Sequence, residues 1–284
     1  MARLPARASS APARTRERII AGLLRLGIPL LCRADDPIGP ASLSGAAPLS
    51  QPNLHLPDLP PAGGDLSVYL EPTDFLDANH PTVQAFVASA IAGASDARAR
   101  AVALFYAVRD RIRYDPYGLV FEPAAYRASA VIAATRGWCV PKAGLLAACA
   151  RAAGIPSAIG LADVVNHLNT EKLRETMGTD VFYDHGYTAL FVEGRWVKAV
   201  PAFNIELCTR FGVRPTEFDG HEHALYQEHD AHGRRHMQYL ADHGTWSDLP
   251  LSQIVADFQR HYPGILARAR ARSAGGAPAD DAFA

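Results

Sequence analysis

Hydrophobic and polar residues follow a helical period in two neighbouring stretches of the chain, residues 81–92 and 97–113. Apolar side chains that recur every three or four residues lie on one face of a helix, and charged residues then occupy the remainder. Ser95 or Asp96 stands before the second stretch and is suited to cap it, because a short polar side chain accepts hydrogen bonds from the first free backbone amides. The apolar face of this second helix consists of Leu104, Phe105, Val108 and Ile112.

A third helix is predicted over residues 141–153. Pro141 stands just inside its start, where the missing N–H of proline removes no helical hydrogen bond. Gly154 and Pro156 mark its end, since glycine commonly follows the last helical residue and proline cannot continue a helix.

Two strands follow later in the chain. Tyr187–Val192 is mainly apolar, Glu193 and Gly194 form a turn, and the chain returns as Arg195–Val200. Two β-rich runs that flank two residues ending in glycine predict a hairpin. Helices followed by antiparallel strands favour an α+β fold over alternating β-α-β units.

The composition narrows the class of protein. Hydrophobic residues make up 49% of the 284 residues and charged residues 20%, which is enough apolar material for a folded core. A net charge of -1 gives no basic field, so we expect no nucleic-acid partner. Four cysteines do not make a disulfide scaffold. No apolar run approaches the roughly 20 residues that cross a bilayer, so we expect no membrane partner.

The two ends of the chain differ in composition from its middle. Residues 1–65 begin Arg-rich and continue rich in Pro, Gly, Ser and Ala, which predicts a flexible N-terminal segment and linker. Residues 66–264 form the predicted folded domain, and 265–284 a flexible C-terminal tail. Arg25 interrupts the apolar stretch near the N-terminus, so we expect a cytoplasmic protein, with secretion through an atypical signal as the alternative.

Cys139 is the residue that points most clearly to chemistry. It stands one or two residues before the predicted helix 141–153. Free backbone amides and a partial positive charge at a helix start favour a thiolate, so we expect a thiol pKa well below 8.5. The same amides are suited to receive an oxyanion. Cys149, ten residues further on, lies on another face of the helix and is expected in the core.

His185 stands at the start of the first predicted strand and is the candidate base for Cys139. Cysteine, histidine and a second strand in this order resemble the transglutaminase-like cysteine enzymes, over roughly residues 100–205. The residues that carry the resemblance are Gly137-Trp138-Cys139, Ala152-Ala153-Gly154-Ile155-Pro156, His185, Trp196 and Pro201-Ala202-Phe203-Asn204. The resemblance implies a papain-like/transglutaminase-like fold, with the helix that bears Cys139 packed on an antiparallel sheet.

Val200 stands where this family has its catalytic aspartate. A valine cannot accept a hydrogen bond from an imidazole N–H, so the orienting group must come from elsewhere or be absent. Asn204 is the preferred substitute, because an asparagine orients the histidine of papain-like enzymes. The alternatives are a dyad of Cys139 and His185, or a degenerate domain without chemistry.

Tyr114 is a candidate second donor to the oxyanion, beside the backbone N–H of Cys139. Packing of its ring is the competing interpretation.

Six of the eleven histidines fall between His221 and His243. His232 and His236 have the i, i+4 spacing that places two imidazoles on one side of a helix. Gly233 weakens a helix there and two arginines between the ligands repel a cation, so a solvated polar loop is the preferred interpretation and we predict no metal site.

The sequence therefore predicts acyl transfer on amide bonds through an acyl-Cys139 intermediate. Hydrolysis by a peptidase or amidase is preferred, transfer to an amine by a transglutaminase is the alternative, and the substrate is a peptide or protein. No cofactor is expected. Two rival classes stay open: a degenerate transglutaminase-like binding module, suggested by Val200, and a metal-dependent hydrolase that uses the histidines from His221 to His243.

Overall fold

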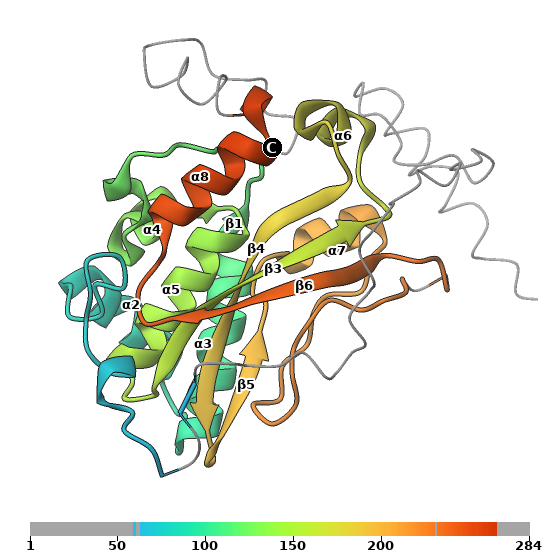
Figure 1. The fold of residues 1–284 in the computed structure, drawn as a ribbon. Helices are drawn as coiled ribbons and strands as arrows, with labels where there is room; N and C mark the ends of the chain where they lie inside the picture. The colour runs from blue at the N-terminus through green and yellow to red at the C-terminus, as the bar shows by residue number, and fades with distance from the viewer. Residues whose placement is uncertain (1–58, 61–62, 231, 266–284) are drawn as a thin grey trace, which may run out of the picture. The chain divides into compact units, whose positions relative to one another are not determined.

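The computed structural model describes residues 59–60, 63–230 and 232–265. These residues form a four-stranded sheet of order β5-β4-β3-β6 in which every neighbouring pair is antiparallel, and a short parallel pair, β1 and β2 (Figure 1). The strands are β1 (Arg113–Tyr114), β2 (Arg136–Gly137), β3 (Ser157–Asn166), β4 (Val181–Val192), β5 (Arg195–Ala199) and β6 (Met237–Trp246).

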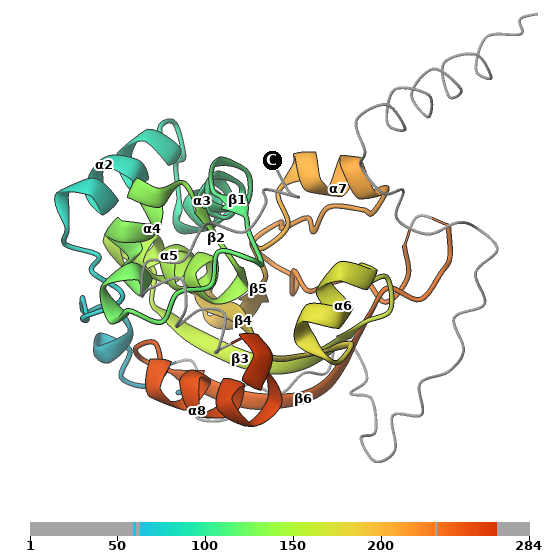
Figure 2. The same ribbon diagram turned by 90° about the horizontal axis from the view of Figure 1, so that it is seen from above.

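Helices α2, α3, α4 and α5 gather on one side of this sheet (Figure 2). The fold is therefore α+β, with the helix that begins at Cys139 packed on an antiparallel sheet, as the sequence predicts. The helices are α2 (Pro81–Ala90), α3 (Ala97–Arg111), α4 (Ala128–Ala134), α5 (Cys139–Ala152), α6 (Glu171–Met177), α7 (Ile205–Phe211) and α8 (Leu251–His261), with short 3-10 turns at Ser67–Tyr69 and Pro123–Tyr126.

Helix α5 is the central helix of the fold. Every one of its residues from Cys139 to Arg151 is buried, and it contacts three helices as well as strands β3 and β4. A helix that is buried all round cannot carry a polar face, so its lysine needs internal partners. Lys142 has them: its Nζ donates to the carbonyls of Arg109 and Ile112 at the end of α3, at 2.9 and 2.5 Å.

Local signals set most of the predicted boundaries. The Asp96 carboxylate caps α3 by accepting from the amide of Ala99 at 2.7 Å. Gly154, with a positive φ of 75°, follows the end of α5. Glu193 and Gly194 both have positive φ, which is the turn that suits the twist of a two-residue hairpin, and they join β4 to β5 as predicted.

Several elements lie outside the predicted pattern, namely β1, β2, β3, α4, α6 and α7 as well as β6 and α8. Strand β6 adds to the free edge of β3, and α8 follows it with Leu251, Ile254 and Phe258 buried. Among the described residues, none of the helices is both long and apolar enough to cross a membrane. The segments predicted as flexible, 1–65 and 265–284, lie for the most part outside the described residues.

Candidate active site

Cys139 is the first residue of α5. The sequence places it one or two residues before the helix, so the helix begins earlier than predicted. Trp138, the N-cap, has extended backbone and gives no side-chain cap, and Pro141 has no N–H to offer. The first amide with a helical acceptor is that of Lys142, which donates to the carbonyl of Trp138 at 3.2 Å. The amides of Cys139 and Val140 therefore have no helical acceptor and lie beside the sulfur of Cys139.

The start of α5 packs against strand β4 at Gly186. A Cβ on Gly186 would lie 2.8 Å from the Cα of Val140, so only a glycine permits the observed approach of α5 to the strand. The β4–β5 ladder ends at the pair Thr188 and Ala199, which leaves the β5 side of Gly186 without a strand partner in that ladder. The Gly186 amide donates toward the thiol of Cys139. His185 is the residue directly before that glycine.

Burial dominates the electrostatics of the thiol. Cys139 is 4% exposed, and burial raises its pKa to about 12 against the opposing effect of the Gly186, Val140 and Cys139 amides. The expectation of a pKa well below 8.5 is therefore wrong for this structure. The helix start acts in the predicted direction, but loss of hydration outweighs it.

His185 is equally buried, at 3% exposed. Its Nε2 lies 3.1 Å from the hydroxyl of Tyr226, and its Nδ1 is buried without a hydrogen-bond partner among the described residues. Burial lowers its pKa to about 3, so the imidazole is neutral at physiological pH. No hydrogen bond between the described side chains joins His185 to the thiol directly. The amide of the next residue, Gly186, donates toward the sulfur.

Asn204 lies elsewhere. It is the N-cap residue of α7, its Oδ1 accepts from the backbone amide of Tyr114 at 3.1 Å, and its Nδ2 lies 3.5 Å from Glu206. The structure does not bring Asn204 to His185, so its predicted role as orienter has no hydrogen bond here. The reason is its position four residues past Val200, where the chain has already left β5.

Tyr114 does lie near the thiol. It pairs with Gly137 in the short β1–β2 ladder, two residues before Cys139. Burial raises its pKa well above 10, and the charge of an ionised Cys139 adds to that effect. The charge of an ionised Cys139 also raises the pKa values of four more buried tyrosines: Tyr126, Tyr226, Tyr239 and Tyr262.

Tyr226 is the site residue that the sequence pattern misses. Its ring meets His185 edge-on at 5.0 Å and lies tilted against Phe203 at 4.9 Å. The one signal for it is an apolar run, Ala224-Leu225-Tyr226, inside an otherwise polar stretch. That run predicts burial but not which strand covers it.

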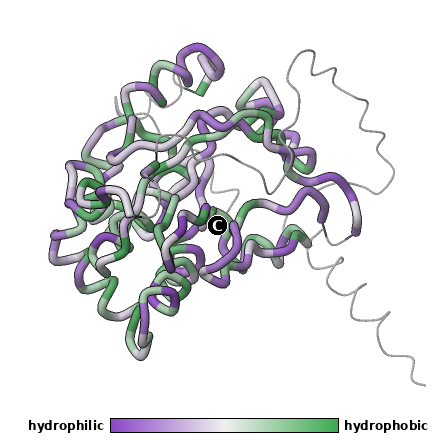
Figure 3. Tube along the Cα trace, turned by 60° about the horizontal axis from the view of Figure 1, so that its bottom comes forward, coloured by the Kyte–Doolittle hydropathy of each residue, from purple (hydrophilic) through white to green (hydrophobic). Residues whose placement is uncertain are grey.

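The histidines from 221 to 236 do not come together. His221 and His232 are exposed, His223 accepts from the Lys198 amide, and buried His236 lies in an irregular segment instead of a helix. Residues 227–230 and 232–236 are mainly hydrophilic and lie in irregular structure (Figure 3). Within the described ranges these five histidines form no group with metal-ligand spacing.

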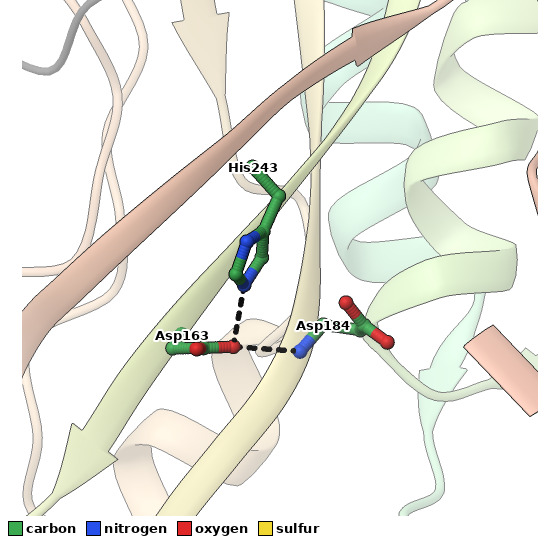
Figure 4. A group of neighbouring side chains, drawn as sticks. All are labelled: Asp163, Asp184 and His243. Carbon is green, nitrogen blue, oxygen red and sulfur yellow. Dashed lines mark hydrogen bonds and ion pairs between the residues drawn. The ribbon is translucent and has the colours of Figure 1, made fainter. Parts of the chain in front are cut away.

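His243 is different, because it joins Asp163 and Asp184 with ligand atoms within 4.8 Å of one another (Figure 4). Its Nε2 lies 2.9 Å from Asp163 Oδ1, which also accepts from the Asp184 amide at 3.2 Å. The hydrogen bond to Asp163 raises the pKa of His243, which favours an imidazolium paired with that carboxylate. This group is an ion pair with a neighbouring acid.

Burial, followed by the negative charge of Asp257, raises the pKa of Asp184 to about 7.

Comparison with known proteins bears on the class. The model of the transglutaminase-like superfamily matches residues 84–201, a span that includes Cys139 and His185, so this part of the chain is similar to that superfamily. Tyr226, β6 and α8 lie beyond the matched span.

The chain is also similar to a solved structure, the crystal structure of a "putative cysteine protease" from Cytophaga hutchinsonii. The two are 14% identical in sequence, and their structures superpose with a TM-score of 0.41. The alignment covers 68% of this chain and 51% of the other, so the chain spans about half the length of that protein. No curated protein matches the chain.

Proposed function

We propose that this protein is a cysteine peptidase or amidase that hydrolyses a peptide or protein amide through an acyl-Cys139 intermediate. The observation that carries the proposal is the position of the thiol. Cys139 is the first residue of α5 and lies beside the amide of Gly186. The residue before Gly186 is His185, whose Nδ1 has no hydrogen-bond partner among the described residues. Nucleophile, base and free amides thus converge where the β4–β5 ladder ends.

The resting pair is neutral, a thiol beside an imidazole, because burial disfavours the charged form of each. Attack therefore couples the two events: Sγ bonds to the substrate carbonyl carbon while the thiol proton moves to Nδ1 of His185. The amides of Cys139 and Val140 receive the developing oxyanion, with Tyr114 as a further donor.

The imidazolium of His185 then protonates the leaving amine, which departs and leaves a thioester on Cys139. Water attacks this thioester with His185 as the base, and the acid product leaves the restored thiol. Attack by an amine in place of water would yield a transamidated product by the same residues.

Peptide hydrolysis tests the proposal directly. A mixture of amide-linked peptides is incubated with the wild-type protein, Cys139→Ala, His185→Ala and Cys149→Ala, and the products are followed by mass spectrometry. We expect cleavage by wild type and Cys149→Ala, and none by the first two variants. Cys149 is the matched control because it is also a buried cysteine of α5.

Two outcomes would overturn the proposal. Cleavage that survives in Cys139→Ala removes the nucleophile from the mechanism. Absence of any covalent adduct at Cys139 with a peptide electrophile, alongside intact folding, identifies a degenerate binding module instead. A primary amine added to the reaction separates hydrolysis from transamidation, because only an amine acceptor gives a product of higher mass than the free acid.

A further inference from the structure

Val200 stands where the transglutaminase-like family has its catalytic aspartate, and a valine side chain cannot take part in proton transfer. Val200 is fully buried, and its backbone amide donates to the carbonyl of Ala224 at 2.9 Å. Ala224 in turn donates to the carbonyl of Lys198 at 2.7 Å, and Ala199 and Ala224 form a parallel bridge. A segment from far along the chain therefore runs beside the end of β5.

This added segment delivers a hydroxyl to the imidazole. Two residues after Ala224, Tyr226 places its Oη 3.1 Å from Nε2 of His185. Tyr226 is 2% exposed, so water does not compete for this hydrogen bond. Its ring is held by Phe203 on one side, and its backbone amide lies 3.4 Å from the hydroxyl of Tyr239. The hydroxyl is therefore fixed in place by packing.

We propose that Tyr226 is the positioning residue of the catalytic histidine and takes over the orienting function that Val200 cannot perform. This inference rests on the proposed function of Cys139 and His185. The Nε2–H of His185 donates to Tyr226 Oη, which leaves the bare Nδ1 lone pair for the thiol proton. This hydrogen bond fixes the orientation of the ring and, with Nε2 as its donor, holds the Nε2–H tautomer.

A phenol differs from a carboxylate in one respect that matters here. Burial raises the pKa of Tyr226 well above its usual value of 10, so the phenol stays neutral at physiological pH. A neutral acceptor orients the imidazole without pairing the charge that His185 gains during attack. We therefore expect an oriented base that is weaker than one paired with an aspartate.

The test is Tyr226→Phe, which removes one oxygen and keeps the ring. Tyr187→Phe is the matched control: Tyr187 is a fully buried tyrosine on the same strand as His185, and its hydroxyl bonds to Asp242 at 2.9 Å. Nitrogen NMR of labelled histidine reports the tautomer, and the His185 signal is identified by its loss in His185→Gln. We expect Nε2–H in wild type and in Tyr187→Phe, and a mixture of tautomers in Tyr226→Phe.

Kinetics add a second readout. We expect kcat to fall about 10- to 100-fold in Tyr226→Phe with KM unchanged, since loss of an orienter weakens general-base catalysis. Tyr187→Phe should keep the wild-type kcat. Melting temperatures of the two variants separate a loss of packing from a loss of orientation.

An unchanged tautomer in folded Tyr226→Phe overturns the inference. The NMR measurement needs no turnover, so it stands even if the wild-type protein cleaves no peptide. A wild type that shows Nε2–H but no activity would therefore contradict the proposed function and leave the placement of His185 by Tyr226 intact.

Discussion

His185 and His243 both lie on the four-stranded sheet, and their surroundings shift their pKa values in opposite directions. His185 on β4 meets the hydroxyl of Tyr226 inside a ring of aromatic side chains, and burial lowers its pKa to about 3. His243 on β6 meets the carboxylate of Asp163 and keeps a third of its side chain exposed, and this hydrogen bond raises its pKa. The identity of the acceptor and the loss of water decide the difference.

The boundary between these two regions runs through a single peptide. Asp184 and His185 are consecutive, yet Asp184 lies with Asp163, His243 and Asp257, whereas His185 lies with Tyr226. Asp184 has a positive φ of 54°, and the β3–β4 register shifts at this point, which turns the acid to one side and the imidazole to the other. The sheet thereby separates a group of acids and His243 from the apolar surroundings of His185.

The largest effect that separates the two regions is on activity. We expect His185→Gln to lower kcat/KM by about 10³-fold or more, because the thiol loses its base. His243→Gln, which removes an exposed ion pair, should change kcat/KM by about twofold at most. Peptide cleavage at a single substrate concentration well below KM measures both. A large loss in His243→Gln would contradict the division and move the acid group into the mechanism.

Much of the fold follows from local signals in the sequence. The capping aspartate Asp96 and the Glu193-Gly194 turn act within a few residues, so the helix α3 and the hairpin are predictable. Strand β6 and helix α8 are less so, because β6 exists only by pairing with β3, some 80 residues earlier. His232 and His236 lie in an irregular segment, in line with the preferred loop interpretation, although His236 is buried.

The candidate site divides in a similar way. The family resemblance identifies Cys139 and His185. Cys139 lies at the start of a helix as expected, whereas His185 lies inside β4, which begins four residues before it, at Val181. The acidity of the thiol depends on burial by distant residues, so helix-start arguments give the wrong sign. Tyr226 reaches His185 through a bridge between Ala199 and Ala224, and no local pattern encodes that contact.

Gly186→Ala tests the packing around Cys139 and His185, and its expected effect on activity is smaller. A Cβ at Gly186 would lie 2.8 Å from the Val140 backbone, so Gly186→Ala must push α5 away from β4. We expect a loss of about 1–3 kcal/mol in the free energy of unfolding, as for other overpacked sites, and reduced peptide cleavage. Urea unfolding measures the first quantity. The pH titration of His243, followed by proton NMR, should stay as in wild type.

Gly144 is the matched control, since it lies in the same helix. A Cβ there meets only Leu76 Cδ2, at the ordinary contact distance of 3.7 Å. Gly144→Ala should therefore stabilise the protein by up to about 1 kcal/mol through helix propensity. Equal destabilisation by both substitutions would show that crowding at β4 is not what requires a glycine at position 186.

The last effect is on the pH dependence of stability, and it tests the group of Asp184, Asp163 and His243. The pKa of Asp184 is raised from 3.8 to about 7 in the folded state, so folding favours its protonated form. Below pH 4 the carboxyl is neutral in both states and burial brings no penalty; the penalty grows as the pH rises to 7 and is complete above it. Asn keeps the shape and tolerates the positive φ, so Asp184→Asn should gain stability over wild type as the pH rises from 4 to 8.

Asp96→Asn gives the opposite sign and serves as the control. The Ala99 amide lowers the pKa of Asp96, so its contribution to stability is present above pH 4 and is lost as the pH falls through the folded-state pKa. Asparagine caps a helix about as well, which leaves the charge as the difference. Melting temperatures from pH 3 to 8 should therefore diverge from wild type upward for Asp184→Asn and downward for Asp96→Asn. If the melting-temperature difference between Asp184→Asn and wild type does not change with pH, the pKa of Asp184 is not raised. The carboxylate of Asp184 would then stay ionised beside His243, and burial would not distinguish its surroundings.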